Sequence, residues 1–440
     1  MRSEASGPGG MARRDELVRE YAAAVRAGSA ELMIGAGLSQ GAGYPGWDEL
    51  LEPFRAEADI PDGITDAAVV AEYVVHEITR ARFEEDLVGT FAKKLACTRT
   101  HHHLGRLAEL GVRSVWTTNY DRLLEDTFPQ AFRIVRDDDY SRVTKVLRQG
   151  RLTKMHGSVK EDQNDIPTWD VAPVITRSDY ETFQVNHPLV WAELQARFLT
   201  NTFLFLGFSF NDPNVEVLLR LSRTVAANIK RSPHFAVMKR ETEPAKARLQ
   251  DLRVRDLELS GIKVCYIKDF GEIDDILADL RRRLIPPTIF VSGSSQTDQL
   301  SQQDYSCIAQ IMAERAPHVS MISMGSGPAY RLGLELLRWQ RRREHYQPEK
   351  IRYYFRSDEI GVREVPAPPT RNGAAIYTDM ERGELLRYLL FRTTAMISIF
   401  PRSRSREEAD LAEENGIPVF HVGSPLDLES FTDWLAAQFD

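Results

Sequence analysis

Short apolar runs and helically spaced apolar positions alternate along most of the chain. Helical spacing over 13–27 is followed by an apolar strand at 32–34, which ends in the glycine-dense stretch Gly35-Ala-Gly-Leu-Ser39. Further short apolar strands are expected at 114–118, 132–135, 152–155, 202–206, 235–238 and 263–267, with helices between several of them. Because alternating strands and helices are typical of parallel sheets, the pattern predicts a doubly wound α/β domain.

Two other features divide the chain. Apolar positions keep helical spacing from about 47 to 96, which predicts a helical insertion in the first domain. Pro286 and Pro287 cannot continue the basic helix before them, so a new domain is expected to begin there. We therefore expect a disordered N-terminus at 1–12, a first domain at 13–285 and a second domain at 286–440.

The second domain repeats the style of the first. Strands are expected at 288–291, 319–323, 395–400 and 418–421, and helices at 305–316, 330–342 and 406–415. Turns rich in glycine and serine follow the first two strands, at Ser292-Gly-Ser-Ser295 and Met324-Gly-Ser-Gly-Pro328. The sequence therefore predicts two Rossmann-like doubly wound α/β domains, the first with a helical insertion.

Composition limits the kinds of partner that the protein is expected to bind and the cell compartment in which it is expected. The formal net charge of −8 over 440 residues provides no overall field for binding nucleic acid. Three widely separated cysteines, Cys97, Cys265 and Cys307, can form neither a disulfide framework nor a four-thiolate zinc site. No apolar run reaches the roughly 18 residues of a membrane span, and the first residues lack the apolar segment of a signal peptide. We expect a cytoplasmic protein that binds neither nucleic acid nor membrane.

Four polar stretches of the first domain occur in a set order. They are Gly35-Ala-Gly-Leu-Ser39, Thr118-Asn-Tyr-Asp121, Lys154-Met-His-Gly157 and Gly207-Phe-Ser-Phe-Asn-Asp-Pro213. Together they resemble the NAD-binding fold of sirtuins, over residues 14 to 285. The resemblance implies NAD as the substrate, with Gly35, Ala36, Gly37 and Ser39 along the pyrophosphate, Gly207 and Ser209 on the adenosine side, Asn119, Asp121 and His156 at the nicotinamide ribose, and Trp47 and Asn211 as further contacts.

The residue types at the nicotinamide end suit hydrolysis of the nicotinamide–ribose bond. Cleavage develops oxocarbenium character at the ribose carbon, so the site needs polar groups that fix ribose and water, together with a general base. His156 is the candidate base because an unperturbed imidazole titrates near neutrality, and Asn119 is expected to orient ribose or water. Taken alone, His156 is more often a structural residue and Asn119 more often a helix cap.

Departures from the sirtuin pattern argue against protein deacylation. The paired C-x-x-C zinc motifs of deacylating sirtuins are missing, so no zinc is expected, and Gly46-Trp-Asp48 stands where those enzymes carry Asp-Phe-Arg. Such departures are typical of the divergent bacterial sirtuin-like domains that hydrolyse NAD in anti-phage defence. The run His101-His-His103 is interpreted as a helix start, because consecutive helical residues point in different directions and cannot converge on a metal.

The second domain resembles a SLOG domain, a Rossmann-like fold that binds nucleotide ligands. The resemblance rests on Phe290-Val-Ser-Gly-Ser294, Met324-Gly-Ser-Gly-Pro328 and the segment 405–419. Catalytic relatives carry P-G-G-x-G-T-x-x-E in the last region, whereas Pro401-Arg-Ser-Arg-Ser-Arg-Glu-Glu408 has lost the glycines, which favours binding over catalysis. Candidate signal-binding residues are Gly293, Ser294, Gly325, Ser326, Gly327, Arg402, Arg404, Arg406 and Glu407, with Arg371 and Arg387 as weaker candidates. A solvated basic loop is the alternative for the arginines.

A sirtuin-like domain followed by a SLOG domain resembles the effector of the Thoeris anti-phage system. That resemblance implies a homo-oligomer, expected to be a tetramer, whose SLOG domain binds a cyclic ADP-ribose isomer made by a TIR-domain protein. Hydrolysis of NAD to ADP-ribose and nicotinamide would then deplete NAD and cause abortive infection. Three alternatives stay open: an NADase controlled by a protein partner such as a HerA-type ATPase, a non-catalytic nucleotide-binding regulator, and an NAD-dependent deacylase.

Overall fold

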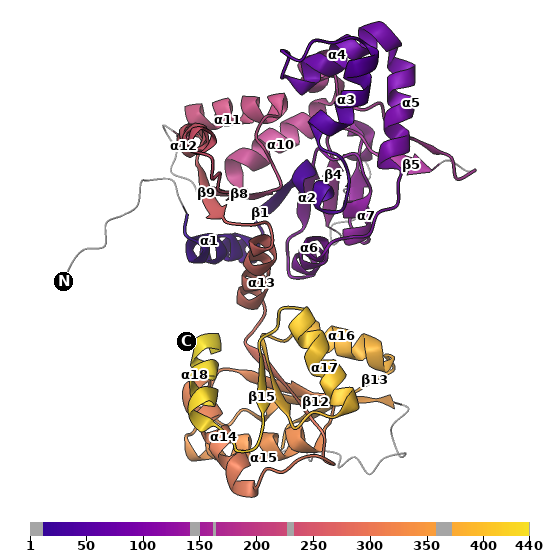
Figure 1. Cartoon of the computed structure of the whole chain (residues 1–440). Helices are drawn as coiled ribbons and strands as arrows, with labels where there is room; N and C mark the ends of the chain where they lie inside the picture. Colours follow the sequence, from indigo (N-terminus) through magenta and orange to yellow (C-terminus); the bar gives the residue numbers. More distant parts are fainter. Residues whose placement is uncertain (1–11, 141–149, 162–163, 227–232, 358–371, 440) are drawn as a thin grey trace, which may run out of the picture. The chain divides into compact units, whose positions relative to one another are not determined.

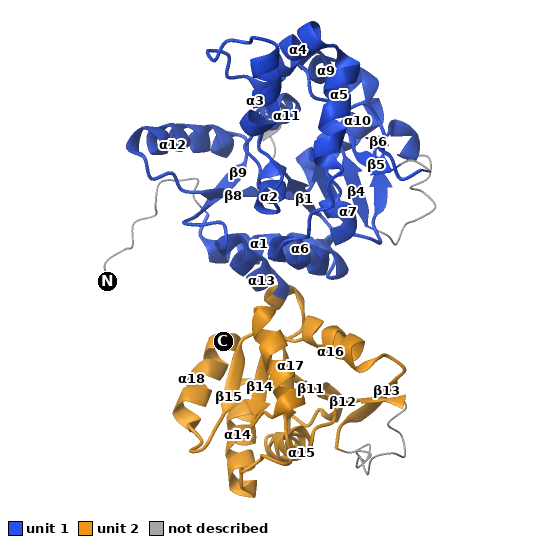
Figure 2. Cartoon of the chain, turned by 45° about the vertical axis from the view of Figure 1, so that its right-hand side comes forward, with its two compact units in different colours: residues 1–281 blue, residues 282–440 orange. Residues whose placement is uncertain are grey.

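The computed structural model describes residues 12–140, 150–161, 164–226, 233–357 and 372–439. Most of the expected disordered N-terminus therefore lies outside the described residues. Ala12, which we placed in that segment, is buried and donates its N–H to the carbonyl of Val264 at 3.0 Å. The chain divides into two compact units, residues 1–281 and 282–440 (Figure 2). The division falls within helix α13 (Glu272–Leu284), slightly before the proline pair at which we expected it.

The first unit is built on a seven-stranded sheet whose neighbouring strands all run parallel, in the order β3-β4-β2-β1-β7-β8-β9 (Figure 1). The strands are β1 (Ala30–Ile34), β2 (Ser114–Thr117), β3 (Phe132–Ile134), β4 (Arg151–Lys154), β7 (Thr202–Leu206), β8 (His234–Lys239) and β9 (Ile262–Ile267). Strands β1 and β7 are buried along their whole length, as apolar strands covered on both faces must be. The chain order changes direction between them, and ligands bind α/β sheets at the carboxyl ends of such a pair.

Helices cover both faces of this sheet. Helices α1 (Arg14–Ala27), α6 (Arg99–Glu109) and α13 lie on one face, and α10 (Pro188–Thr200) and α11 (Pro213–Ala226) lie on the other (Figures 1 and 2). Helices α9 (Arg177–Asn186) and α12 (Pro244–Leu259) contribute to the same core as α10 and α11. That core is rich in aromatic side chains, since Trp116, Phe203 and Phe205 of the sheet pack with Trp191 and Phe198 of α10.

The segment after β1 is largely helical. Helix α2 (Ala36–Gly41) begins directly after β1, so the expected glycine turn is shorter than predicted. Helices α3 (Trp47–Glu57), α4 (Ala67–Ile78) and α5 (Arg80–Phe91) form the expected insertion. Their own core joins Phe54, Val74 and Phe83 to Tyr120 and Val159, which follow β2 and β4. The insertion therefore packs directly on the loops at the carboxyl edge of the sheet. Short elements complete the unit: α7 (Leu123–Thr127), η1 (Asp137–Asp139) and the antiparallel pair β5 (Val159–Glu161) and β6 (Pro167–Trp169).

The second unit has a six-stranded parallel sheet in the order β13-β12-β11-β10-β14-β15. Its strands are β10 (Thr288–Gly293), β11 (Ser320–Ser323), β12 (Ile351–Arg356), β13 (Ala374–Thr378), β14 (Ala395–Ile399) and β15 (Val419–Val422). Successive residues of β10 face opposite sides of the sheet. Ile289 and Val291 pack with α14 (Gln302–Arg315), α15 (Gly327–Arg342) and α18 (Leu428–Phe439). Phe290 packs instead with α16 (Arg382–Phe391) and α17 (Ser403–Glu414). A short helix, η2 (Pro348–Lys350), precedes β12.

The predicted fold class, two Rossmann-like doubly wound α/β domains, is confirmed. Strands β5, β6, β12 and β13 and helices α9, α10, α11, α16 and α18 were not predicted from the sequence. Across the described ranges, no helix combines the length and the apolar character that a membrane crossing requires.

Candidate active site

The loops after β1 and β7 touch at the centre of the carboxyl edge. The N–H of Gly37 donates to the carbonyl of Gly207 at 2.9 Å, and the N–H of Gly35 donates to the carbonyl of Leu206 at 3.0 Å. A Cβ on Gly37 would lie 2.9 Å from Cα of Gly207, and Gly207 itself has a φ of 62°. The close approach and the left-handed conformation both require residues without a side chain.

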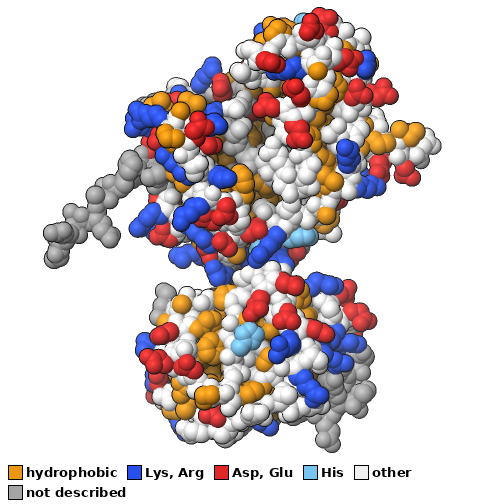
Figure 3. Space-filling view, viewed as in Figure 1, with side chains coloured by type: hydrophobic (Ala, Val, Ile, Leu, Met, Phe, Trp, Pro, Cys, Tyr) orange, Lys and Arg blue, Asp and Glu red, His pale blue; other side chains and the backbone are white. Residues whose placement is uncertain are grey.

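These loops border a cavity of about 1470 Å³ within the first unit. Figure 3 shows this unit hollowed between the side that carries α12 and the side that carries α4. Small-molecule pockets usually hold about 300–1,000 Å³, so this cavity has room for a dinucleotide. All the first-domain site residues predicted from the sequence line it: Gly35, Ala36, Gly37, Ser39, Trp47, Asn119, Asp121, His156, Gly207, Ser209 and Asn211. Their contacts with NAD stay predictions.

Asn119 follows β2, and its carboxamide is held through the nitrogen alone. Nδ2 donates to the carbonyl of Gly35 at 3.1 Å and to Oγ of Ser39 at 2.9 Å. Oδ1 is buried, and no described residue donates a hydrogen bond to it. Because leaving a buried carbonyl oxygen unpaired is costly, this atom points to a bound molecule as its partner. Asn119 is also not the helix cap: the N–H of Leu123, at the start of α7, donates to Asp121.

Ser39 and Asp121 fix the orientation of Asn119. The hydroxyl of Ser39 donates to Oδ2 of Asp121 at 2.6 Å, while Oδ1 of Asp121 accepts the N–H of Leu123 at 3.0 Å. Both carboxylate oxygens of Asp121 are therefore engaged within the protein, and the side chain is almost fully buried. We predicted that Ser39 lines the pyrophosphate and that Asp121 takes part in catalysis. Their contacts favour a positioning role for both.

His156 follows β4 and is 1% exposed. Its ring packs edge-on against Tyr180 and Phe183, with centroids 5.1 and 6.0 Å away. Nε2 lies 3.4 Å from Oδ2 of Asp212, at ion-pair distance, and forms no hydrogen bond with a described residue. Burial lowers the pKa of His156, and the nearby Asp212 carboxylate opposes that shift. The imidazole is therefore neutral near pH 7 and able to accept a proton.

Asp212 is the functional candidate that the sequence analysis missed. Its Oδ1 accepts the N–H groups of Asn214 and Val215 at 2.9 and 3.2 Å, at the start of α11. An aspartate followed by proline is a helix-start signal, which could have indicated the cap. Its second oxygen approaches His156 only because β4 and β7 end at the same edge of the sheet. No sequence pattern encodes that contact.

The histidine run at 101–103 lies in the first turns of α6, so the predicted helix start is confirmed. His101 takes part in the cap, since its Nδ1 accepts the N–H of Thr98 at 3.2 Å. In the ranges that the structure describes, no cluster of three potential metal-ligating side chains occurs.

The predicted signal-binding glycines and serines of the second unit lie at the carboxyl ends of β10 and β11. A Cβ on Gly293 would lie 3.1 Å from Cβ of Pro328, so the two turns are close neighbours. Gly325 has a φ of 72°, and Oγ of Ser326 caps α15 by accepting the N–H of Ala329 at 3.3 Å. Ser294 and Gly327 belong to the same turns. Whether these residues bind a ligand stays a prediction.

The arginines of the second unit are arranged differently from the prediction. Helix α17 begins at Ser403 rather than at Arg406, so Arg404 and Arg406 are exposed helical residues and not loop residues. Arg402 precedes the helix, and its guanidinium donates to the side chain of Gln296. Arg387 is exposed on α16, and Arg371 lies outside the described residues.

A buried carboxylate was missed in this second unit. Glu408 accepts hydrogen bonds from Ser292 and, at 2.9 Å, from Arg382. Burial raises the pKa of Glu408, while both partners oppose the shift. Arg382 also lies 3.6 Å from Glu407, which is exposed and was predicted to bind the signal.

The family model described as "SIR2-like domain" matches residues 113–257, the part of the chain that contains Asn119 and His156. This match lies wholly within the first unit. The predicted resemblance to defence-associated sirtuin-like proteins is confirmed by the relatives of the chain. The SLOG resemblance of the second unit stays a prediction.

Several relatives of the chain carry names that refer to NAD hydrolysis and to defence. "NAD(+) hydrolase ThsA" of Enterococcus faecium is 32% identical, over 63% of this chain and 60% of that protein. The protein of the same name from Bacillus cereus is 30% identical, over 63% and 59%. "Defense-associated sirtuin 2" of Bacillus subtilis is 21% identical, over 50% and 22%. The chain thus spans about 60% of the length of the ThsA relatives.

Among solved structures, a chain from "Structural Basis for the Mechanism and Regulation of Sir2 Enzymes" is matched over 97% of its length and 60% of this chain. The two share 16% sequence identity and a TM-score of 0.31.

Proposed function

We propose that the protein is an NAD⁺ glycohydrolase that cleaves NAD into ADP-ribose and nicotinamide. One observation carries the proposal: Oδ1 of Asn119 and Nε2 of His156 are buried, lack hydrogen bonds to described residues, and line one cavity with the glycine loops. Two unpartnered polar atoms in a cavity large enough for a dinucleotide suit a substrate and a water molecule. The names of the ThsA relatives support the same activity.

In this reaction a water oxygen bonds to C1′ of the nicotinamide ribose as the bond from C1′ to the pyridinium nitrogen breaks. The electron pair of the broken bond stays on that nitrogen, so nicotinamide leaves as a neutral molecule. His156 accepts the proton that water loses, and Asp212, 3.4 Å away, stabilises the resulting imidazolium. Asn119 Oδ1 accepts a hydrogen bond from the water or from a ribose hydroxyl, while Nδ2 is held by Gly35 and Ser39.

The test is NAD turnover by the purified protein, followed through nicotinamide release. His156→Ala and Asn119→Ala are each expected to lower turnover by at least about 100-fold, because they remove the base and the orienting amide. His76→Ala and Asn186→Ala are matched controls, since both residues are exposed and neither lines the cavity. Wild-type turnover in either active-site variant would contradict the role given to that residue. A wild-type protein that binds NAD without any turnover, both alone and with each activator tested below, would favour the non-catalytic regulator.

We further propose that a nucleotide signal, a cyclic ADP-ribose isomer, controls hydrolysis by binding the second unit of a homo-oligomer in bacterial anti-phage defence. The SLOG resemblance and the adjoining glycine turns after β10 and β11 support this proposal. The signal can activate only if it binds the active arrangement more tightly than the resting one.

Adding a panel of cyclic ADP-ribose isomers to the purified protein tests this control. Turnover that one isomer stimulates, and that Gly327→Arg abolishes without lowering basal turnover, would support it. Turnover that appears only with an added HerA-type ATPase would replace the small signal with a protein partner. Light scattering measures the oligomer, which we expect to be a tetramer.

A further inference from the structure

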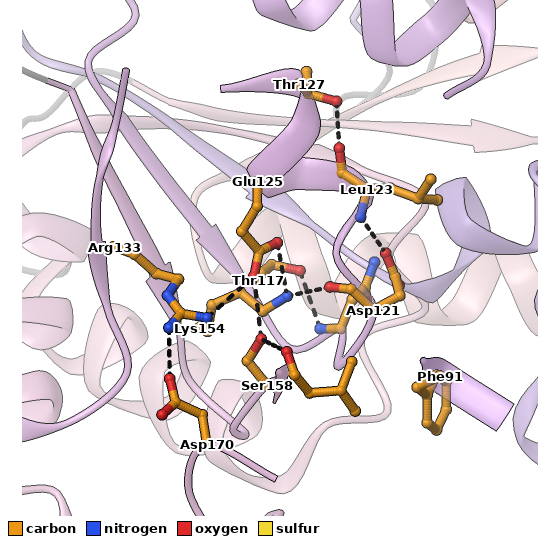
Figure 4. Close-up of polar contacts among 12 residues, drawn as sticks. Phe91, Thr117, Asp121, Leu123, Glu125, Thr127, Arg133, Lys154, Ser158 and Asp170 are labelled. Carbon is orange, nitrogen blue, oxygen red and sulfur yellow. Dashed lines mark hydrogen bonds and ion pairs between the residues drawn. The ribbon is translucent and has the colours of Figure 1, made fainter. Parts of the chain in front are cut away.

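A fully buried ammonium group links the two loops that carry Asn119 and His156. Lys154, at the end of β4, has a side chain with 0% exposure. Its Nζ donates to the backbone carbonyl of Asp121 and lies 3.2 Å from Oε2 of Glu125 on α7 (Figure 4). A buried charge is costly unless it is paired and hydrogen-bonded, so this group depends on both partners.

Glu125 extends the link to the loop of His156. Its Oε1 accepts the hydroxyl of Ser158 at 3.1 Å and lies 3.7 Å from Nη1 of Arg133 (Figure 4). Lys154 precedes His156 and Ser158 follows it on the same short stretch of chain. The Lys154–Glu125 pair therefore holds the loop of His156 on both sides.

The contact with Asp121 extends the link to Asn119. Lys154 holds the main chain of Asp121, and the Asp121 carboxylate accepts the hydroxyl of Ser39, which in turn accepts Nδ2 of Asn119. Figure 4 shows Lys154 with Asp121 on one side and Glu125 on the other. Neither Lys154 nor Glu125 lines the large cavity, so any effect on a bound molecule passes through other residues.

We propose that the Lys154–Glu125 ion pair is the positioning element that sets the spacing between Asn119 and His156. The inference rests on the proposed NAD hydrolysis and adds two residues that do not touch the substrate. Without the pair the two loops lose their common anchor. A misplacement of about 1 Å between reacting groups lowers turnover on the order of 100-fold, whereas binding in the unaltered remainder of the cavity persists.

The test is the double variant Lys154→Met/Glu125→Gln. Removing one charge leaves its partner buried and unpaired, which destabilises the unit, whereas the double variant removes both charges together. Lys263→Met/Glu16→Gln is the matched control, because Lys263 on β9 pairs with Glu16 on α1 and neither residue lines the cavity. For each protein we would measure kcat and KM for NAD, ADP-ribose affinity by calorimetry, and hydrogen exchange of segments 117–123 and 154–159.

The inference predicts a fall in kcat of about 10- to 100-fold, with KM and ADP-ribose affinity within about twofold of wild type. Both segments should exchange faster in the double variant and at the wild-type rate in the control. Unchanged kcat, raised KM with unchanged kcat, or an equal loss in the control would overturn it. Where the double variant does not fold, Ser158→Ala is measured and judged by the same criteria, because it removes the hydroxyl that Glu125 accepts and leaves both charges paired.

The same experiment separates this inference from the proposed activity. A wild-type protein without turnover, both alone and with each activator named above, would refute hydrolysis. The exchange rates and ADP-ribose affinity would still test the positioning role of the Lys154–Glu125 pair. Faster exchange confined to both segments would then support it, and unchanged exchange would overturn it.

Discussion

Replacing Gly37 with alanine tests whether the cavity depends on the close approach of the loops after β1 and β7. The added Cβ would lie 2.9 Å from Cα and 3.0 Å from the carbonyl oxygen of Gly207. Carbon atoms in contact are about 3.5–4.0 Å apart, so the two loops must separate by about 0.6 to 1.1 Å. This separation would also weaken the hydrogen bond that the carbonyl of Gly207 accepts from the N–H of Gly37 at 2.9 Å.

Two opposing terms set the change in the free energy of unfolding. Overpacking costs about 1–3 kcal/mol, whereas alanine in place of glycine within a helix gains about 0.5–1 kcal/mol. The net loss is at most about 2.5 kcal/mol, which a domain with about 5–15 kcal/mol of stability tolerates. Misplacing groups that hold a reacting molecule by about 1 Å costs on the order of 100-fold in turnover. Activity should therefore fall far more than stability.

The assay compares initial rates of nicotinamide release, ADP-ribose affinity and thermal unfolding of Gly37→Ala with those of wild type. Gly89→Ala in α5 is the control, because a Cβ at Gly89 meets nothing within 4 Å. This control should keep the wild-type rate and gain slightly in stability. A Gly37→Ala protein with wild-type kcat/KM would refute the reasoning, since the loops would then separate without consequence.

Three further predictions concern titration. Because burial lowers the pKa of His156, the acid limb of the kcat–pH profile should lie below the usual 6.5; a limb at or above that value contradicts the assignment of the base. Asp212→Asn keeps the cap of α11 but removes the charge that raises the pKa of His156, so the limb should move to still lower pH; an unmoved limb would mean that the two residues are not coupled. Burial and nearby arginines lower the pKa of His103 from 6.5 to about 3. The stability that neutral His103 contributes is therefore complete above pH 6.5 and is lost as the pH falls, by about 2 kcal/mol between pH 7 and pH 5. Denaturant titrations of His103→Gln should show a pH dependence smaller by that amount, and an undiminished dependence argues against the buried neutral imidazole.

The sirtuin resemblance gave the residues of the candidate site, and a rule about parallel sheets explains why they lie together. Gly35, Asn119, His156 and Gly207 each come shortly after a buried apolar strand. The carboxyl ends of parallel strands meet at one edge, so these residues come together although they are far apart in the chain. All four line the same cavity.

The pairings inside the site could not be predicted, because they depend on contacts between strands that the sequence does not order. Strand β4 lies beside β2, which brings the ammonium of Lys154 to the carbonyl of Asp121. The hydroxyl of Ser39 bonds with both Asn119 and Asp121, contacts that were not predicted, while its expected place along the pyrophosphate stays a prediction. The hydrophobic pattern of the sequence indicates where each strand ends. Which strand ends are neighbours depends on the order of the strands in the folded sheet.

The start of α17 was misplaced for a local reason. The run from Arg402 to Arg406 has no apolar position to indicate helical spacing, so the helix was predicted from Arg406 onward. Helix α17 begins earlier, at Ser403, and the hydroxyl of Ser405 accepts the N–H of the N-cap residue Arg402 at 2.8 Å. Capping by side chains, rather than periodicity, fixes this boundary.

The charges around the candidate site suit a reaction in which positive charge moves from the pyridinium ring to the ribose. Asn119 and neutral His156 add no cation at the point where the oxocarbenium character develops. The ammonium of Lys154 is nearby but is balanced by Glu125 at 3.2 Å. An unbalanced buried cation would oppose the developing charge, since Coulomb energies are large where water is excluded. The pairing of Lys154 with Glu125 therefore serves the electrostatics of the proposed reaction as well as the spacing of Asn119 and His156.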